Sequence, residues 1–270
     1  MNNPLSYSSI KLDLFSKEGA LLKSASGFVV ENEKQYNLIT NWHVLSGKDI
    51  ITQDLHEPVI EQPHSLQTSI HIIGGEGENK FPLSWGTWKR LTIQLYDDGN
   101  MPKWIECRVN KQNHPVIDIV ALPIQLDLNF ANLVSRNVLQ GNSGTYFWSK
   151  ISAIPISAID TDVEYCPPDT VYTIGYPLDW APQGTEKPGP AYWRTSSIAS
   201  EIDKVSSSQE DLFFIDPRAL EGMSGSPVVG MKNDRIKLLG VYSNSSNVGF
   251  SANAGLVWSA SFIKRLIGTS

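Results

Sequence analysis

The stretch Leu220-Glu221-Gly222-Met223-Ser224-Gly225-Ser226-Pro227-Val228-Val229 decides how the rest of this sequence is interpreted. Gly222 and Gly225 allow a tight turn whose backbone can closely approach a bound molecule. Pro227 and the two valines after it favour a strand. A serine in a glycine turn directly before a buried strand is one way in which hydrolases present a nucleophile. The same residue types are common in surface turns, so the stretch alone leaves both interpretations open.

A nucleophilic serine needs a base, and the order of the histidines limits the possibilities. All five of them precede Ser224: His43, His56, His64, His71 and His114. In α/β-hydrolases the histidine follows the nucleophile, which lies in a Gly-x-Ser-x-Gly elbow. Because no histidine follows Ser224 and Ser226 follows Gly225, that class is excluded. The orders His–Asp–Ser and Asp–His–Ser remain.

His43 lies at the end of a predicted hairpin. Residues 26–30 (SGFVV) and 36–40 (YNLIT) are apolar, strand-like runs, and the polar residues 31–35 between them favour a turn. A single histidine is more often structural than catalytic, and the hairpin alone does not select His43; the family resemblance described below does. The polar segment 46–80 holds His56, His64 and His71, whose spacing matches no zinc site.

An aspartate that orients the histidine is expected at a strand start between His43 and Ser224. The run 114–124 (HPVIDIVALPI) fits, because one acid among apolar strand residues is costly unless it is paired. Alternation places Ile117, Ile119 and Ala121 on one face of this strand and Asp118, Val120 and Leu122 on the other. Asp97 and Asp98 are weaker candidates, since together with Gly99-Asn100 they form a predicted hairpin turn.

These three segments together resemble chymotrypsin-fold serine peptidases, most closely the bacterial trypsin-like peptidases of the HtrA type. Gly27-Phe28-Val29-Val30 and Thr40-Asn41-Trp42-His43-Val44 resemble the family's histidine segment, and residues 118–122 (DIVAL) resemble its aspartate run with one insertion. Residues 171–178, 238–243 and 255–267 are similar to later strands and to the closing helix. Met223 departs from the usual Gly-Asn-Ser-Gly motif.

The resemblance implies an all-β fold of two six-stranded antiparallel barrels with a short C-terminal helix. Residues 1–125 would form the first barrel, which carries His43 and Asp118. Residues 126–150 would form the linker. Residues 151–270 would form the second barrel, which carries Ser224, and the closing helix.

The implied activity is that of a serine endopeptidase that works through an acyl-enzyme. Ser224 would attack the peptide bond, His43 would act as the base, and Asp118 would orient His43. The backbone N–H groups of Gly222 and Ser224 would form the oxyanion hole. No metal or organic cofactor is implied.

The resemblance also predicts a specificity pocket. Its walls would come from Arg218, Ala219, Leu220, Glu221, Ser243, Asn244 and Ser245. No aspartate stands at the expected floor position, which is Arg218, so cleavage after Lys or Arg is not expected. An inward Arg218 would favour an acidic residue at P1. An outward Arg218, paired with Asp216 or Glu221, would leave a pocket for a small or medium apolar residue, which is the favoured version because a buried unpaired arginine is costly.

A second serine, Ser143, lies in a segment that resembles the family's Gly-Asn-Ser-Gly motif. Gly141-Asn142-Ser143-Gly144 matches it better than the segment around Ser224 does, but Thr145-Tyr146 follows. Ser143 also lies only 25 residues after Asp118, too few for most of a second barrel. We therefore assign Ser143 to the linker.

The composition and net charge of the chain limit the classes of molecule that it is expected to bind. The 270 residues are 41% hydrophobic and 19% charged, which indicates a globular chain. A net charge of −6 disfavours nucleic acid and anionic membranes, and no apolar run approaches the ~18 residues of a membrane span. The expected partner is a protein or peptide substrate, with a regulatory protein as a further possibility. The start lacks signal-peptide features and only Cys107 and Cys166 are present, so we expect a cytoplasmic protein with reduced cysteines.

Three other functions use the same features. A protease-fold binding module would keep the shape without the activity, and a scaffold protein would use long loops such as residues 181–190 for docking. An esterase would use the same triad on another substrate. Intact His43, Asp118 and Ser224 argue against the binding module.

Overall fold

The computed structural model of the chain describes residues 4–33, 35–50, 52, 54–55, 61–76, 85–107, 117–124, 139–140, 145–149, 153–159, 165–200, 212–232, 235–243 and 254–268. The elements of the first half are η1 (Pro4–Tyr7), β1 (Ser9–Phe15), β2 (Leu21–Asn32), β3 (Gln35–Thr40), α1 (Trp42–Ser46), β4 (Ser65–Glu76), β5 (Trp85–Gln94), β6 (Ile105–Glu106) and β7 (Val120–Pro123). Those of the second half are β8 (Leu139–Gln140), β9 (Thr145–Ser149), β10 (Ile154–Pro155), η2 (Ile156–Ala158), β11 (Thr170–Gly175), β12 (Tyr192–Ile198), β13 (Leu212–Asp216), β14 (Pro227–Lys232), β15 (Arg235–Ser243), β16 (Gly255–Ser259) and α3 (Ser261–Ile267).

The N-terminal strands form one curled sheet. Its order is β6-β7-β3-β2-β1-β4-β9-β8, with β10 added to β2 and β5 added to β4. Alternate residues of the central strands enter a buried cluster, to which Leu12, Leu14, Val29 and Leu38 belong. This period of two is the pattern that apolar-in, polar-out strands require.

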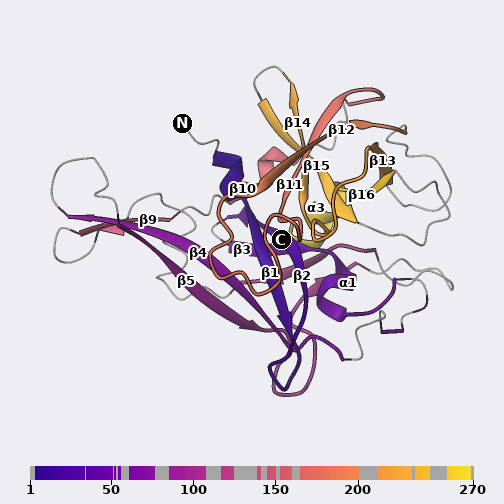
Figure 1. Ribbon diagram of the computed structural model, residues 1–270. Helices are drawn as coiled ribbons and strands as arrows, with labels where there is room; N and C mark the ends of the chain where they lie inside the picture. Colours follow the sequence, from indigo (N-terminus) through magenta and orange to yellow (C-terminus); the bar gives the residue numbers. More distant parts are fainter. Residues whose placement is uncertain are drawn as a thin grey trace.

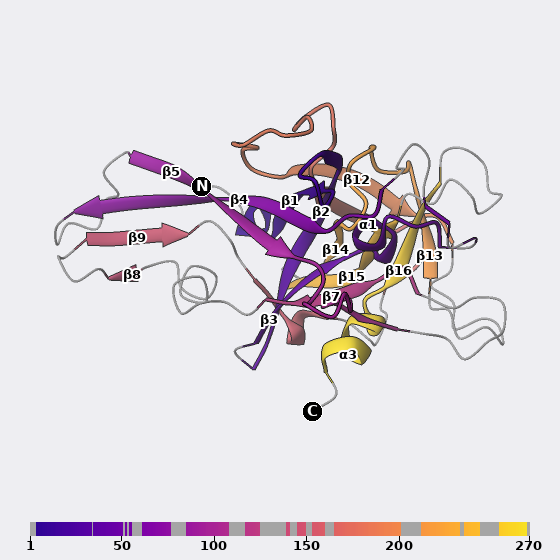
Figure 2. The same ribbon diagram turned by 90° about the horizontal axis from the view of Figure 1, so that it is seen from below.

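Strands β4 and β5 continue beyond this cluster as a long hairpin. Ser65 to Gly74 pair with Gln94 to Trp85, and β9 adds to the far end of β4. Figures 1 and 2 both show this arm, with β9 on it, extending away from the body of the molecule, and Figure 2 also shows β8 there.

The C-terminal strands close into a six-stranded barrel in the order β11-β12-β13-β16-β15-β14. Its interior is filled by fully buried side chains such as Phe213, Val228 and Tyr242. The helix α3 follows the last strand and buries Phe262, Ile263 and Leu266. Figure 1 shows this barrel beside the first sheet, and in Figure 2 α3 lies at the edge of the body, close to the C-terminus.

The predicted fold class is confirmed: the protein is all-β, with a closed six-stranded second barrel and a short C-terminal helix. The first unit is a curled half-barrel sheet that the β4–β5 arm enlarges. The domain boundaries stay predictions. Within the predicted linker, residues 139–140 and 145–149 form β8 and β9 of the first sheet, and β10 from the start of the predicted second barrel pairs with β2. Ser143 lies outside the described residues.

The two units share a buried interface. Phe28 and Ile39 of the first sheet belong to one apolar cluster with Ile174 and Val241 of the second barrel. Residues 222–226, here called the serine turn, lie at this junction. The N–H of Gly225 donates to the carbonyl of Tyr242 at 2.9 Å inside the second barrel. On the other side of the turn lies β2 of the first sheet.

No helix among the described residues is long and apolar enough to cross a membrane.

The fold predicts that Gly225 is required for the junction. Its φ is +87°, and a Cβ there would overlap the carbonyl of Ser26 and the hydroxyl of Thr40. We expect Gly225→Ala to lower the free energy of unfolding by more than about 4 kcal/mol. Gly189 is the matched control, because its φ is +75° but a Cβ meets nothing within 4 Å.

Gly189→Ala should cost only the roughly 1–2 kcal/mol of a left-handed conformation. Urea unfolding of the two variants and the wild type measures both values. Equal losses for the two variants would show that the close approach of Gly225 to the first sheet does not matter.

Candidate functional site

His43 is carried by a one-turn helix at the end of β3. Asn41 precedes α1 in an extended conformation, and Gly47 ends it in a left-handed one at φ 71°. The N–H of Gly47 donates to the carbonyl of His43 at 3.2 Å. The His43 side chain is 17% exposed, so the ring keeps access to solvent while the backbone around it is buried.

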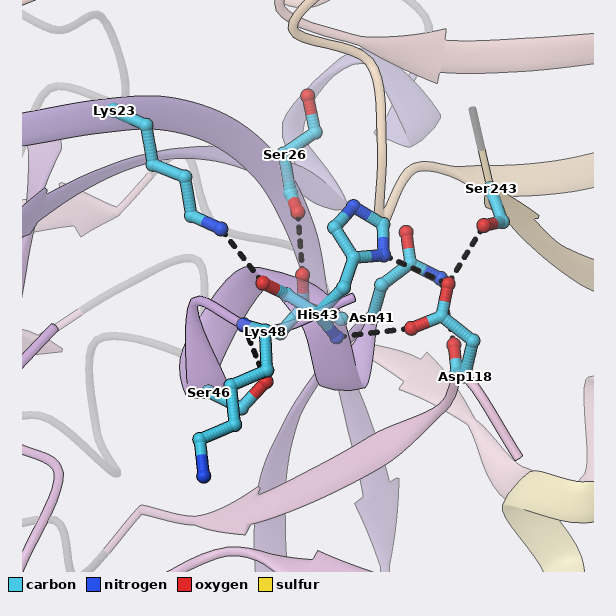
Figure 3. A network of polar contacts seen from close by, with 9 residues as sticks. Lys23, Ser26, Asn41, His43, Ser46, Lys48, Asp118 and Ser243 are labelled. Atoms are coloured by element: carbon cyan, nitrogen blue, oxygen red, sulfur yellow. Dashed lines mark hydrogen bonds and ion pairs between the residues drawn. The ribbon is translucent and has the colours of Figure 1, made fainter. Parts of the chain in front are cut away.

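Asp118 is the partner of His43. It precedes β7 by two residues and is 1% exposed. The His43 Nδ1 lies 2.8 Å from Asp118 Oδ2, and the His43 backbone N–H donates to Oδ1 at 2.9 Å. Ser243 donates its hydroxyl to Oδ2 at 2.6 Å. Figure 3 shows the three groups converging on the carboxylate.

These bonds fix the chemistry of the imidazole. A buried carboxylate needs hydrogen-bond donors, and an ionised one can only accept. His43 therefore carries its proton on Nδ1, and its Nε2 has a lone pair that can accept another proton. Asn41 adds support, because its Nδ2 donates to the carbonyl of Asp118 at 2.7 Å.

The serine turn is held against β2 by one residue, Ser26. The N–H of Ser26 donates to the carbonyl of Ser224 at 2.9 Å. The Ser26 hydroxyl donates to the carbonyl of Gly222 at 3.0 Å and accepts the N–H of Tyr176 at 2.9 Å. Ser26 is fully buried, so these bonds are shielded from water. These bonds hold the turn at its first residue, Gly222, and at its central residue, Ser224.

Two further contacts bring the serine turn to the His43–Asp118 pair. Thr40, three residues before His43, donates its hydroxyl to the carbonyl of Ser26 at 2.8 Å. Tyr242, whose N–H donates to the carbonyl of Ser226 at 2.9 Å, directly precedes Ser243 on β15. Strand β15, which carries the Ser243 bond to Asp118, therefore also bonds to the serine turn, and strand β3, which ends three residues before His43, bonds to Ser26.

The predicted oxyanion-hole residues lie in this turn. Gly222 has a φ of +88°, a conformation that favours glycine. Within the described residues its N–H has no hydrogen-bond acceptor. Met223 is completely buried in the barrel core, so the turn is anchored between Gly222 and Ser224. Ser224 itself is half-buried.

The predicted pocket residues have different environments. Arg218 is exposed and forms no ion pair with another described residue, which includes Asp216 and Glu221. Ala219 is buried, and its carbonyl accepts the Tyr242 hydroxyl at 3.2 Å.

The remaining predicted pocket residues range from fully buried to exposed. Leu220 is half-buried, and Glu221 is exposed with its carbonyl accepting the N–H of Leu178 at 2.9 Å. Ser243 is fully buried, with its hydroxyl on Asp118. Asn244 and Ser245 lie outside the described residues.

The weaker aspartate candidates are in a surface turn. The Asp97 carboxylate accepts the N–H groups of Gly99 and Met101 at 2.9 and 2.8 Å, which is the predicted hairpin turn. Both cysteines are free. The described residues contain no group of three His, Cys, Asp or Glu side chains that could hold a metal ion.

Sequence reasoning did not identify Ser26, and it assigned Ser243 to the pocket rather than to Asp118. Ser26 stands in the strand expected before His43, but no local pattern marks a serine whose partners lie 196 and 150 residues away. Ser243 is likewise 125 residues from Asp118.

Comparison with known proteins gives one family. The profile of the trypsin-like peptidase domain matches residues 25–241, about four-fifths of the chain, and this range includes His43, Asp118 and Ser224. No curated protein matches the sequence at a significant level. The match and the two-unit β fold agree: the chain belongs to the trypsin-like peptidase domain family.

Proposed function

We propose that this protein is a serine endopeptidase that hydrolyses peptide bonds through an acyl-enzyme, with Ser224, His43 and Asp118 as its triad. Family membership supports a serine-peptidase type of function and a protein or peptide substrate. The observation that carries the triad is the bidentate contact between Asp118 and His43, at 2.8 and 2.9 Å. We also infer that the closest members are of the HtrA type, on the sequence resemblance.

In the proposed reaction the Ser224 hydroxyl attacks the peptide carbonyl carbon, and His43 Nε2 takes the serine proton. Asp118 stays ionised and stabilises the imidazolium through the Nδ1–H bond. His43 then gives its proton to the leaving amine, which departs and leaves the acyl group on Ser224. Water repeats the sequence with His43 again as base, and it releases the carboxylate product.

The negative charge on the tetrahedral oxygen needs donors that are already in position. We assign this role to the N–H groups of Gly222 and Ser224. The Ser26 bonds to the carbonyls of the same two residues support the assignment, because they restrain the orientation of the turn's backbone before a substrate binds. Each donor of this kind typically contributes about 100- to 1000-fold to kcat.

We propose that the pocket favours a small or medium apolar residue at P1. The exposed Arg218 supports this version over the one with an inward guanidinium. Burial raises the pKa of Tyr242 to about 12, and the charges of Arg218 and Arg194 oppose this rise. In this version Ala219 and Leu220 would line the pocket, and the exposed guanidinium of Arg218 would not enter it.

The first prediction concerns the triad. Ser224→Ala and His43→Ala should each lower kcat by roughly four orders of magnitude or more, and the double variant should be little worse, because the residues act as a unit. Peptide-library cleavage measures this, with circular dichroism to show that the variants are folded. Ser143→Ala is the control and should cleave like the wild type.

Residual activity above about a tenth of wild type in Ser224→Ala would refute the assignment. Absence of turnover in the wild type would favour the binding module, and hydrolysis of esters but not of peptides would favour the esterase.

The second prediction concerns P1. A substrate series varied only at P1 should give the highest kcat/KM for small or medium apolar residues. Arg218→Ala should change this order little, because the guanidinium is exposed. Strong cleavage after Lys or Arg would contradict both versions of the pocket, because neither has an acidic residue at its floor. Cleavage after Asp or Glu that disappears in Arg218→Ala would select the inward arginine instead.

A further inference from the structure

A lysine of the first sheet reaches the backbone of the histidine. Lys23 lies on β2, and its ammonium donates to the carbonyl oxygen of His43 at 2.6 Å. Figure 3 shows the Lys23 side chain extending from β2 to the His43 carbonyl oxygen, to which a dashed line joins it. Lys23 precedes the segment that matches the family, which begins at residue 25.

The His43 peptide groups are therefore held on both sides. The N–H donates to Asp118 Oδ1 at 2.9 Å, and the carbonyl accepts from Lys23 and from the N–H of Gly47. The helix that carries the imidazole has only five residues, too few to be stable by itself. Its geometry must come from such tertiary bonds, and a bond from a charged donor is among the stronger ones.

We propose that Lys23 is a positioning residue for the hydrolysis assigned above. Its ammonium fixes the backbone of His43, and its positive charge favours the neutral imidazole, which is the form that can accept the Ser224 proton. The inference rests on the proposed function for its effect on turnover. The proposed effect of the Lys23 charge on the His43 imidazole does not depend on whether the protein is a peptidase.

Asp118 is the charged group that acts most directly on Lys23, since its carboxylate favours the ammonium form. On β1, Asp13 pairs in register with Ser24 and binds both Ser24 and Lys11. Because neighbouring strand residues point to opposite faces, this ion pair lies on the other face from Lys23.

Three other charged residues among the described parts of the chain next to α1 contact other groups or point away from His43. On β6, Glu106 accepts the indole N–H of Trp42 at 2.9 Å. After the helix, Asp49 accepts the N–H of Thr52 at 3.0 Å. The ammonium of Lys48 points away from His43 in Figure 3.

The protonation of Lys23 changes within a measurable pH range. Burial lowers the pKa of Lys23 to about 8, and the Asp118 carboxylate opposes this shift. Above about pH 8 the folded protein loses the ammonium, while the unfolded chain keeps it up to the ordinary value of 10.5. Between pH 8 and 10.5 the unfolded state therefore binds more protons than the folded state. Through this group, the free energy of unfolding rises as the pH rises across that range. A fall of kcat above pH 8 through Lys23 is therefore not an unfolding effect.

Three variants test the proposal. Lys23→Met keeps the length of the side chain but removes the charge and the donor, and it should lower kcat roughly tenfold or more while KM changes little. Lys23→Arg keeps a charge that does not titrate, so it should retain most of kcat and lose the alkaline fall near pH 8. Lys48→Met, a lysine at the same helix without the bond to His43, should resemble the wild type.

A second measurement needs no turnover. NMR titration of the His43 imidazole should give a higher pKa in Lys23→Met than in the wild type, because a nearby cation is gone, and no change in Lys48→Met. An unchanged His43 pKa in folded Lys23→Met would overturn the proposal whether or not the protein cleaves peptides. Equal changes in Lys23→Met and Lys48→Met would overturn it as well. Loss of turnover in every protein, with the His43 shift present, would instead count against the peptidase function alone.

Discussion

The buried carboxylate of Asp118 is the constraint on which the site depends. A carboxylate that is 1% exposed is stable as an anion only if it is fully hydrogen-bonded. Its donors come from two parts of the fold, His43 on the helix after β3 and Ser243 on β15 of the second barrel. The same carboxylate therefore links the two units through hydrogen bonds, and it also sets the tautomer of the His43 imidazole. Removing any one donor leaves a buried charge with fewer partners.

Ser26 provides the second link between the units. A single buried residue of the first sheet binds the carbonyls of Gly222 and Ser224 and the N–H of Tyr176. The close approach of β2 explains why glycine stands at position 225. The serine turn is thus ordered by contacts with both units, and the proposed oxyanion hole requires such ordering because its backbone donors must be in place before the reaction begins.

Local patterns predicted the parts of this structure that depend on local chemistry. The alternation in residues 117–122 is an example, since Ile117, Ile119 and Ala121 enter one buried cluster and Val120 and Leu122 enter the other. Asp97 lies in the predicted turn because its carboxylate bonds to backbone N–H groups only a few residues away. The bonds of Ser26, of Lys23 and of Ser243 to Asp118 could not be predicted, because each joins residues that only the folded chain brings together. The length of the β4–β5 arm was not predicted either, because its residues include strand-like runs and polar segments without a clear period.

Trapping of the covalent intermediate tests the central claim most directly. The protein is mixed with an activated peptide ester, quenched in acid within the first turnover, digested with trypsin and analysed by mass spectrometry. The account predicts the acyl mass on the peptide that runs from Ala219 to Lys232, located on Ser224, and no adduct in His43→Ala. Consumption of the ester without any adduct, or an acyl group on Ser143 or on a cysteine, would contradict it.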